Sequence, residues 1–219
     1  MLKSIVIATR NQGKAAEFRD MLSPLGIEVL SLLDLPEGAA PDVVEDGETF
    51  AANAEKKARA AAEALGRPAL ADDSGLCVDA LDGAPGVYSA RYAGEPSNDE
   101  RNNEKLLREL AAAGAEHTTA DGVAALSPAR FVCALALYIP EEGRTIPAEG
   151  AVEGAIVPEP RGSGGFGYDP LFYVPGLGKT FGEAAPQEKH RVSHRGKALL
   201  ALADKLKHET GGRLEPAAE

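Results

Sequence analysis

The sequence has no tryptophan and only two cysteines, Cys77 and Cys133, among its 219 residues. Both cysteines lie in apolar, strand-like stretches, which favours a packing role over a disulfide or a pair of metal ligands, so a zinc site is not expected. No apolar run is long enough to cross a bilayer, and the chain begins without the pattern of a secretory leader. We therefore expect a cytoplasmic protein.

Basic residues are scarce: 23 lysines and arginines stand against 34 aspartates and glutamates, a formal net charge of -11. This balance argues against general affinity for a nucleic-acid backbone, which requires clustered cations. A small polyanion remains a candidate ligand if the few basic residues converge. The hydrophobic content of 44% and the 24 glycines fit one large α/β domain or two fused lobes with a real core.

Hydrophobic periodicity predicts alternating strands and helices in the first half of the chain and a long hairpin in the second. The predicted strands are 2–8, 27–31, a stretch ending near 71, 76–78, and the hairpin arms 131–139 and 144–157. Helices are expected after residue 13, from about 50 to 65, from 99 to 110, and from Ser193 onward, while 111–128 is expected to be a surface connection. The pattern predicts an α/β fold: a mixed β-sheet with flanking helices, in two lobes with an active-site cleft between them.

Two adjacent acids, Asp72 and Asp73, follow the apolar stretch 68–71. We interpret this as a buried strand that ends in two carboxylates. Two like charges at the end of a central strand need compensation, usually from a divalent cation or a basic cluster that binds substrate. The alternative is a solvated turn, since Asp and Ser-Gly are ordinary turn formers.

A polar segment joins the first strand to the first helix: Thr9, Arg10, Asn11, Gln12, Gly13 and Lys14. Backbone amides at a helix N-terminus form an anion site, to which Lys14 would add a full charge. The segment is not a Walker motif, because the spaced glycines and the Lys-Ser/Thr pair are missing. A polar connection that binds nothing is the alternative.

Further candidates flank the long helix that follows. Asn53 and Lys57 are four residues apart, so both side chains can reach one point. Glu45 lies ahead of that helix and could join Asp73 around a magnesium ion through hard oxygen ligands. Acids near a helix start are also commonplace, because they favour the helix dipole.

A glycine-rich loop at 161–170 places Phe166 and Tyr168 at alternate positions. Such a loop allows a flat ring to approach closely and stack, although the two aromatic rings could instead lie in the core. Beyond the loop, Lys189, His194 and Arg195 crowd the start of the last helix, where cations oppose the dipole. A bound anion or a carbonyl-rich ligand would explain them, and surface solvation is the alternative.

Six blocks carry a resemblance that spans the chain from its first strand to its last helix. The blocks are Thr9-x-Asn11-x-x-Lys14, Glu45-Asp46-Gly47-x-Thr49-Phe50-x-x-Asn53-Ala54-x-x-Lys57-Ala58, Asp72-Asp73-Ser74-Gly75-Leu76, Gly83-Ala84-Pro85-Gly86-Val87-Tyr88-Ser89-Ala90-Arg91, Gly164-Gly165-Phe166-Gly167-Tyr168-Asp169-Pro170 and Ser193-His194-Arg195-Gly196. Together they resemble the inosine triphosphate pyrophosphatase family, the Ham1-like proteins.

The resemblance implies a homodimeric, magnesium-dependent enzyme with one domain of two lobes over 1–210 and a frayed tail at 211–219. Such an enzyme hydrolyses non-canonical purine nucleoside triphosphates, namely ITP, dITP and XTP. It cleaves between the α and β phosphates and releases the monophosphate and pyrophosphate.

The resemblance also assigns roles to residues of this sequence. Asp73 and Lys14 would be catalytic, with Asp73 activating the attacking water and Asp72 assisting it, while Glu45 and Asp73 would hold Mg²⁺. The residues implied to hold the triphosphate are Thr9, Arg10, Asn11, Gln12, Gly13, Lys14 and Lys57. The residues implied to contact the nucleoside are Ser74, Phe166, Gly167, Tyr168, Asp169, Lys189, His194 and Arg195, with Phe166 and Tyr168 sandwiching the purine.

Two other functions remain open at this point. One is a related pyrophosphatase that acts on modified pyrimidine or methylated nucleotides. The other is a nucleotide sensor without catalysis, which the presence of Asp73, Glu45 and Lys14 disfavours because a sensor needs no acid that activates water.

Overall fold

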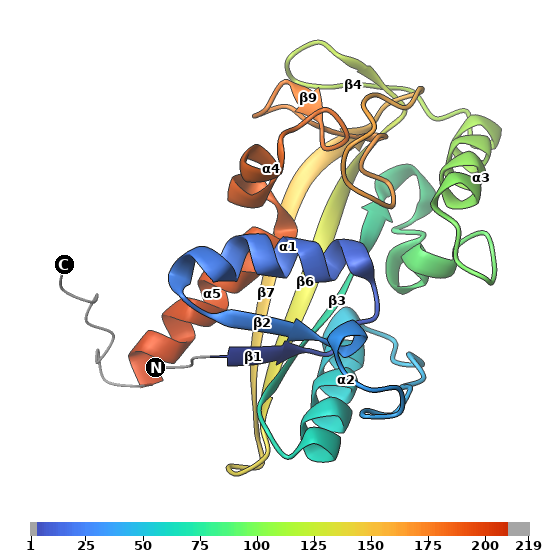
Figure 1. Cartoon of the computed structure of the whole chain (residues 1–219). Helices are drawn as coiled ribbons and strands as arrows, with labels where there is room; N and C mark the ends of the chain where they lie inside the picture. The colour runs from blue at the N-terminus through green and yellow to red at the C-terminus, as the bar shows by residue number, and fades with distance from the viewer. Residues whose placement is uncertain (1–3, 210–219) are drawn as a thin grey trace, which may run out of the picture. The chain divides into compact units, whose positions relative to one another are not determined.

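The computed structural model describes residues 4–209 and divides the chain into two compact units (Figure 1). The first unit comprises Met1–Asp73, Cys133–Gly150 and Arg195–Glu219, and the second comprises Ser74–Val132 and Ala151–His194. The predicted tail at 211–219 lies outside the described residues. No helix within the described residues is both long and apolar enough to span a membrane.

One seven-stranded sheet has the order β2-β1-β3-β6-β7-β8-β9. Its strands are β1 (Ser4–Ile7), β2 (Glu28–Ser31), β3 (Ala69–Val78), β6 (Ser127–Ile139), β7 (Arg144–Ile156), β8 (Phe172–Val174) and β9 (Lys179–Thr180). Strand β1 pairs in parallel with β2 and β3, whereas β8 pairs antiparallel with β7 and β9. The expected mixed sheet flanked by helices is therefore confirmed.

The helices of the first unit are α1 (Gln12–Leu22), α2 (Phe50–Leu65) and most of α5 (His194–Glu209), with short 3-10 turns at Ser23–Leu25 and Leu32–Asp34. Helix α2 begins at the N-cap Thr49, whose side chain accepts a hydrogen bond from the Ala52 N–H, and ends at Gly66 in the left-handed conformation. These are the ordinary start and stop of a helix.

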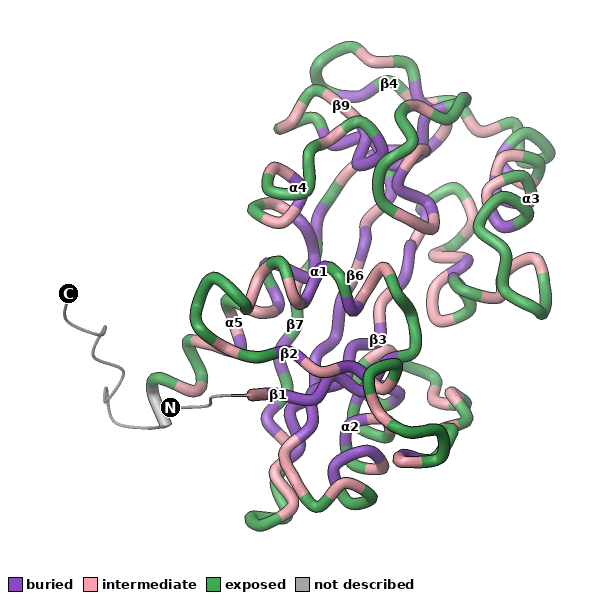
Figure 2. Tube along the Cα trace, in the orientation of Figure 1, coloured by how far each residue is buried: buried purple, intermediate pink, exposed green. Residues whose placement is uncertain are grey.

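The first unit has one helix layer on each face of its strands, which are among the buried segments in Figure 2. Helix α2 packs its alanines against one face, in a cluster that includes Ala69 and Ala71 of β3. Helices α1 and α5 pack against the other face, in a cluster that includes Leu70 of β3. Successive residues of a strand point to opposite faces, so β3 is buried on both sides.

The second unit contains α3 (Asp99–Ala112), α4 (Pro186–Val192), a two-stranded sheet of β4 (His117–Thr118) and β5 (Ala124–Ala125), and 3-10 turns at Asp79–Leu81 and Gly86–Arg91. Its core is more aromatic. The rings of Phe131 and Phe172 have centroids 4.6 Å apart, and Phe181 packs on Phe172 at 5.3 Å. Leu106 and Leu110 of α3 are buried against the same cluster.

Three local predictions differ from the structure. Strand β3 does not end at the paired acids but continues to Val78, so Asp72 and Asp73 lie inside a ten-residue strand. Part of the supposed surface connection at 111–128 forms the β4–β5 pair. The short helix α4 was not predicted, and it ends at Ser193 directly before α5. The cleft expected between the lobes stays a prediction.

Candidate active site

The two adjacent acids of β3 face opposite helix layers, because side chains alternate along a strand. Asp73 continues the series of Ala69 and Ala71, which pack against α2. Asp72 continues the series of Leu70, which packs against α1 and α5. Both acids are buried, with 1% of Asp72 and 5% of Asp73 exposed. One dipeptide therefore supplies carboxylates to two separate polar networks.

Asp73 lies between two side chains that project from successive turns of α2. Asn53 Nδ2 donates to one of its carboxylate oxygens at 3.1 Å, and Lys57 Nζ donates to the other at 3.1 Å. The expectation that Asn53 and Lys57 reach one point is thus confirmed, and the point is Asp73. Lys57 Nζ also lies 3.2 Å from Glu45 Oε1, so a single ammonium serves both carboxylates.

Asn53 also fixes the segment that carries Glu45. Its Oδ1 accepts a hydrogen bond from the Gly47 N–H at 2.8 Å. A Cβ atom on Gly47 would lie only 2.6 Å from that oxygen, so the close approach requires glycine. The side-chain amide of Asn53 therefore links Asp73 to the backbone of the segment that carries Glu45.

Burial raises the pKa of Asp73 to about 6, against the opposing pull of Lys57 and Lys14, and the neighbouring Glu45 adds to the rise. Burial acts on Glu45 in the same sense, but Lys57, the hydrogen bond with Asp73 and Lys14 together outweigh it and lower the pKa of Glu45. Asp73 is therefore mostly ionised at neutral pH and still basic enough to accept a proton.

Asp72 differs from Asp73 in the partners that surround its carboxylate. Arg195 Nε donates to its Oδ2 at 3.0 Å, Lys14 Nζ forms an ion pair with Oδ1, and the Cys133 thiol donates to Oδ2 at 3.0 Å. Burial disfavours its charge, but Arg195 and Lys14 prevail and hold the pKa of Asp72 well below its usual value. A carboxylate that is so strongly stabilised is a poor proton acceptor and a good anchor.

Arg195, which was predicted to contact the edge of a purine, is almost completely buried. Only 1% of it is exposed, and its guanidinium also forms an ion pair with Glu17 of α1. Carboxylates on β3 and α1 thus compensate the cation at the start of α5, a position for which the sequence suggested a ligand or surface solvation. Glu17 and Cys133 escaped sequence reasoning because their partners are more than 60 residues distant in the chain.

The predicted anion loop forms the start of α1. Asn11 is the N-cap and its Oδ1 accepts from the Lys14 N–H at 2.9 Å, while Thr9 Oγ1 accepts from the Asn11 N–H at 3.1 Å. The N–H groups of Gln12 and Gly13 belong to the first turn, where helix geometry provides no carbonyl partner. The Arg10 side chain has other partners: it donates a hydrogen bond to the Ala40 carbonyl and forms an ion pair with Asp42.

Glu45 and Asp73 fit a magnesium ion that completes its coordination with substrate and water. Within residues 4–209, no three His, Cys, Asp or Glu side chains are grouped to enclose a metal. Mg²⁺ is commonly held by only one or two carboxylates plus substrate phosphates. The two carboxylates already share one cation, Lys57, and the raised pKa of Asp73 marks a deficit of positive charge.

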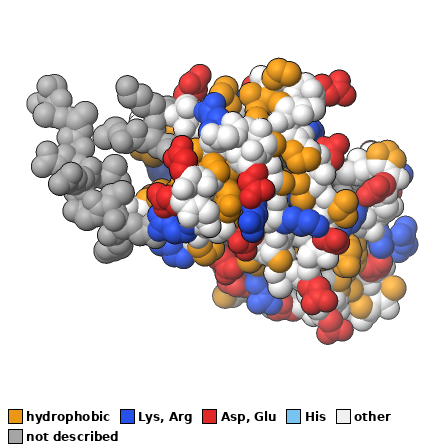
Figure 3. Space-filling model, turned by 90° about the horizontal axis from the view of Figure 1, so that it is seen from below, with side chains coloured by type: hydrophobic (Ala, Val, Ile, Leu, Met, Phe, Trp, Pro, Cys, Tyr) orange, Lys and Arg blue, Asp and Glu red, His pale blue; other side chains and the backbone are white. Residues whose placement is uncertain are grey.

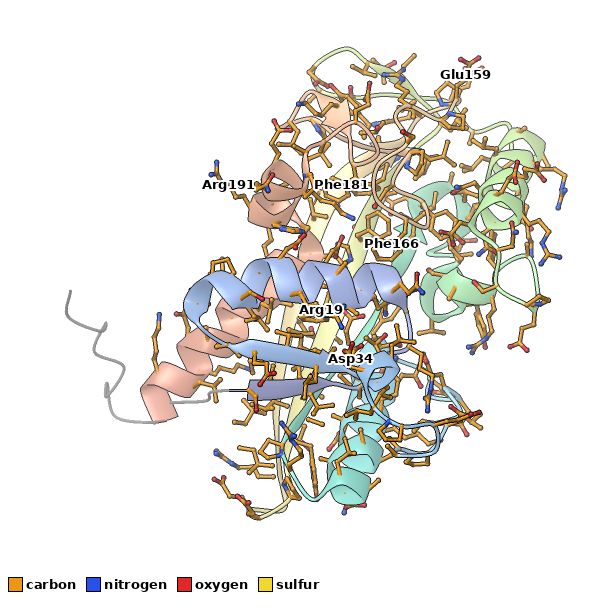
Figure 4. The ribbon with its side chains drawn as sticks, viewed as in Figure 1. Arg19, Asp34, Glu159, Phe166, Phe181 and Arg191 are labelled. Atoms are coloured by element: carbon orange, nitrogen blue, oxygen red, sulfur yellow. The ribbon has the colours of Figure 1, made fainter. Side chains whose placement is uncertain are left out.

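The second unit holds a cluster of rings around one buried ion pair. Lys189 Nζ of α4 lies 2.6 Å from Asp169 Oδ2, and both side chains are almost fully buried. The same nitrogen is 5.0 Å from the centroid of Phe166 and 5.4 Å from that of Phe181, both labelled in Figure 4. Phe166 is partly exposed, so it can offer a ring face to a ligand.

The other predicted nucleoside contacts are less accessible. Tyr168 is 4% exposed, lies in the core cluster and donates its hydroxyl to the Ser89 carbonyl at 2.8 Å. His194 is also 4% exposed and stacks on Phe131 with centroids 4.8 Å apart. Ser74 is half-buried in β3. Of the two aromatic side chains of the loop, only Phe166 presents a ring to solvent.

Comparison with known proteins identifies the family of this chain. The Ham1 family model matches residues 5–205. The chain belongs to the Ham1 family. A dITP/XTP pyrophosphatase of Geobacillus kaustophilus is 54% identical over 213 residues, covering 97% of this chain and 98% of that protein. A dITP/XTP pyrophosphatase of Desulforamulus reducens is 53% identical over 195 residues, which cover 89% of this chain and 91% of that protein.

Solved structures support the Ham1 fold. A HAM1 protein from Coxiella burnetii shares 43% identity with a TM-score of 0.79, covering 95% of this chain and all of its own. The Staphylococcus aureus Ham1 protein shares 42% identity with a TM-score of 0.76 over 94% of this chain and all of its own. The family resemblance found in the six sequence blocks is therefore confirmed.

Proposed function

We propose that this Ham1-family chain hydrolyses the non-canonical purine nucleoside triphosphates ITP, dITP and XTP to the monophosphate and pyrophosphate, with Mg²⁺ as cofactor. The names of its dITP/XTP pyrophosphatase relatives support the reaction. The observation that carries the proposal is the environment of Asp73: a buried carboxylate with a pKa of about 6, beside Glu45 and held by Lys57 and Asn53.

In this reaction the triphosphate lies at the N-terminus of α1, where first-turn amides and Lys14 meet its negative charge. Lys57 adds a second cation close to Asp73. Glu45 and Asp73 would hold Mg²⁺, which when bound supplies positive charge to the phosphoryl oxygens and the leaving group. Asp72 anchors Lys14 and thereby fixes the position of its ammonium.

Asp73 orients the attacking water and accepts its proton. The water oxygen forms a bond to the α-phosphorus, and the bond from that phosphorus to the bridging oxygen breaks, so pyrophosphate leaves with the electron pair. A general base of this kind contributes about a hundredfold or more to the rate. The raised pKa of Asp73 supports this role, whereas the lowered pKa of Asp72 makes it unsuitable.

For the base we propose stacking on Phe166, with Lys189 as a cation near the same ring. A purine stacked on an aromatic side chain gains about 1 to 3 kcal/mol. We assign Tyr168 and Arg195 to other roles, because the first supports the core and the second neutralises Asp72 and Glu17. Contacts of His194 and Ser74 with the nucleotide remain proposals.

Product analysis tests the reaction directly. Incubation of ITP with the protein and Mg²⁺ is expected to release IMP and pyrophosphate in equal amounts. Free phosphate with IDP would instead indicate a phosphatase, and tight binding without turnover would indicate a sensor. A panel with modified pyrimidine and methylated nucleotides separates the related pyrophosphatases.

Dependence on Mg²⁺ is tested in the same assay. Removal of the ion with EDTA is expected to abolish turnover, and addition of Mg²⁺ is expected to restore it. The homodimer, which rests on the family resemblance, and the cytoplasmic location, which rests on the sequence pattern, are also proposals. Sedimentation of the purified protein tests the former, and fractionation of source cells tests the latter.

A further inference from the structure

Two side chains of helix α3 form hydrogen bonds with one glycine, Gly167, of the glycine-rich loop at 161–170, which we call the aromatic loop. Asp99 Oδ2 accepts a hydrogen bond from the Gly167 N–H at 2.7 Å. Asn103 Nδ2 donates to the Gly167 carbonyl at 3.0 Å. The two side chains are four residues apart and so lie on one face of α3. Both polar groups of a single loop residue are therefore satisfied by the same helix.

Gly167 is the residue directly after Phe166, so its position determines where that ring lies. The φ of Gly167 is 61°, a left-handed conformation that favours glycine. On the other side of the ring, the Phe166 N–H donates to Asp169 Oδ2 at 2.9 Å. The backbone of Phe166 is thus held from both flanks, by Asp169 within the loop and by α3 outside it.

The side of the loop that faces α3 borders open space. A groove of about 470 Å³ separates α3 from the loop over much of its length, and its walls include Phe166 and Gly165. Ser163, Gly164 and Gly165 are exposed. With open space beside the loop, the two hydrogen bonds to Gly167 are its principal polar links to α3.

We propose that Asp99 and Asn103 are positioning residues that fix the Phe166 ring for the purine base, and so help to set affinity for the nucleoside. The inference rests on the proposed function, in which Phe166 stacks on that base. Neither residue touches the reacting phosphates. Their effect should therefore appear in substrate binding rather than in the chemical step.

A simpler explanation covers only half of the observation. Acids in the first turn of a helix are favoured by its dipole, which accounts for an aspartate at position 99. The dipole gives no reason for Asn103 one turn later. It also does not explain why the two side chains converge on the N–H and the carbonyl of one glycine.

The chain offers a matched control for Asn103 in its neighbour, Asn102. Asn102 Nδ2 donates to the Ala90 carbonyl at 3.1 Å, and its Oδ1 accepts from the Ala93 N–H at 2.7 Å. It is the same residue type in the same helix and its Nδ2 likewise donates to a backbone carbonyl, but it also accepts a second hydrogen bond and holds a different segment. Asn102→Ala should therefore lower the thermal stability without loosening the aromatic loop.

Four variants test the inference: Asp99→Ala, Asp99→Asn, Asn103→Ala and Asn102→Ala. Hydrogen exchange of the backbone amides from 162 to 169 measures the order of the loop, and steady-state kinetics with ITP and Mg²⁺ measure KM and kcat. Asp99→Ala and Asn103→Ala should exchange faster at Gly167 and raise KM about fivefold, the loss of one hydrogen bond. Their kcat should stay within about twofold.

The conservative variant separates geometry from charge. Asp99→Asn keeps an oxygen that can accept the Gly167 N–H but removes the charge, so it should retain the exchange and KM of the unaltered enzyme. If Asp99→Asn instead matches Asp99→Ala, the charge and not the hydrogen bond is responsible, and the proposal is overturned.

Failure of the inference and failure of the proposed function are distinguishable. An unaltered enzyme that does not convert ITP to IMP and pyrophosphate contradicts the proposed function. If the unaltered enzyme turns over but Asp99→Ala and Asn103→Ala leave exchange or KM unchanged, the positioning role is wrong. A KM that rises equally in Asn102→Ala also overturns it, because the effect would then be structural.

Discussion

The polar networks of the first unit and the aromatic cluster of the second are built in opposite ways. In the first unit, side chains on the regular elements β3, α1, α2 and α5 supply three carboxylates and three cations (Asp72, Asp73, Glu17, Lys14, Lys57 and Arg195). Only Glu45, the fourth carboxylate, comes from the irregular segment before α2. In the second, Phe166 lies on a glycine-rich loop beside one ion pair. Phosphoryl chemistry tolerates little misplacement, which favours rigid elements, whereas a flat base can stack on an adjustable ring.

A second comparison, within β3 itself, is between the two adjacent acids. Asp72 and Asp73 are neighbours of the same type and are almost equally buried, yet their pKa values move in opposite directions. Asp72 has two close cations, whereas Asp73 shares its lysine with another carboxylate. Burial alone therefore does not decide the role of an acid; the number of partners does.

The largest effect on turnover is expected from Asp73→Asn. The substitution keeps the shape but removes the proposed base and a metal-ligand charge, so kcat with ITP should fall about a thousandfold. Thermal melting should change less than kcat, because the substitution keeps one of the two oxygens that Asn53 and Lys57 contact. A variant whose kcat stays within tenfold of the unaltered enzyme would rule out Asp73 as the base.

Asp72→Asn should act chiefly on stability, and so serves as the counterpart of the first variant. It leaves the buried Arg195 with less compensating charge, a change that costs about 3 to 5 kcal/mol. Urea unfolding of the two variants side by side measures the contrast. Equal unfolding midpoints for Asp72→Asn and Asp73→Asn would mean that the two networks do not differ as their contacts indicate.

Phe166→Ala tests the second unit and should affect binding more than chemistry. Loss of a stacked ring is expected to raise the KM for ITP about tenfold or more, with kcat less affected. Tyr168→Phe is the control, since it keeps the ring and removes only the hydrogen bond to Ser89. An equal rise in KM for both variants would show that the loop acts as a whole rather than through Phe166.

The smallest effect concerns Glu188, whose carboxylate accepts from the Ala185 N–H and pairs with Lys179 at the start of α4. These contacts, the Ala185 hydrogen bond first, lower the pKa of Glu188. Its stabilising contribution is present above the unfolded pKa of about 4.3 and is lost as pH falls through the lower folded value.

Glu188→Gln should therefore unfold more easily than the unaltered protein at neutral pH, and this difference should vanish near pH 3. Urea midpoints at pH 3, 5 and 7 measure it. A difference that persists at pH 3 would indicate lost packing rather than lost charge.

Sequence reasoning recovered most of the first unit because its information is local. Helix α2 is defined by Thr49, by its alanine stripe and by Gly66, and the spacing of Asn53 and Lys57 correctly placed both on one point. The same reasoning ended a strand at Asp72 and Asp73, since propensity treats acids and Ser-Gly as turn formers. Tertiary contacts with Lys14, Lys57 and Arg195 compensate the charges and let β3 continue.

Contacts between distant segments set the limit of prediction. Arg195 is 123 residues from Asp72 and 178 from Glu17, so nothing near it in the sequence announces either partner. The cation was noticed, but a ligand was invoked to explain it. Likewise, the alternation of Phe166 and Tyr168 did not reveal that one ring is partly exposed and the other is in the core.

Charges of both signs are interspersed on the face seen in Figure 3, and exposed pairs such as Arg19 and Asp34, labelled in Figure 4, lie outside the buried networks. Such exposed pairs contribute about 0 to 1 kcal/mol each. The net charge of -11 therefore describes the surface and says little about the site, where cations and carboxylates are closely matched.

The alternation of β3 has a consequence for how this enzyme can diverge. Inserting or deleting one residue between Leu70 and Asp72 would exchange the faces of the two acids relative to Ala69 and Leu70. A change in the length of the strand therefore cannot move the proposed catalytic carboxylate gradually. New substrates must be reached by altering the residues that surround a fixed acid, above all on the loop of the second unit, where insertions leave the strand register untouched.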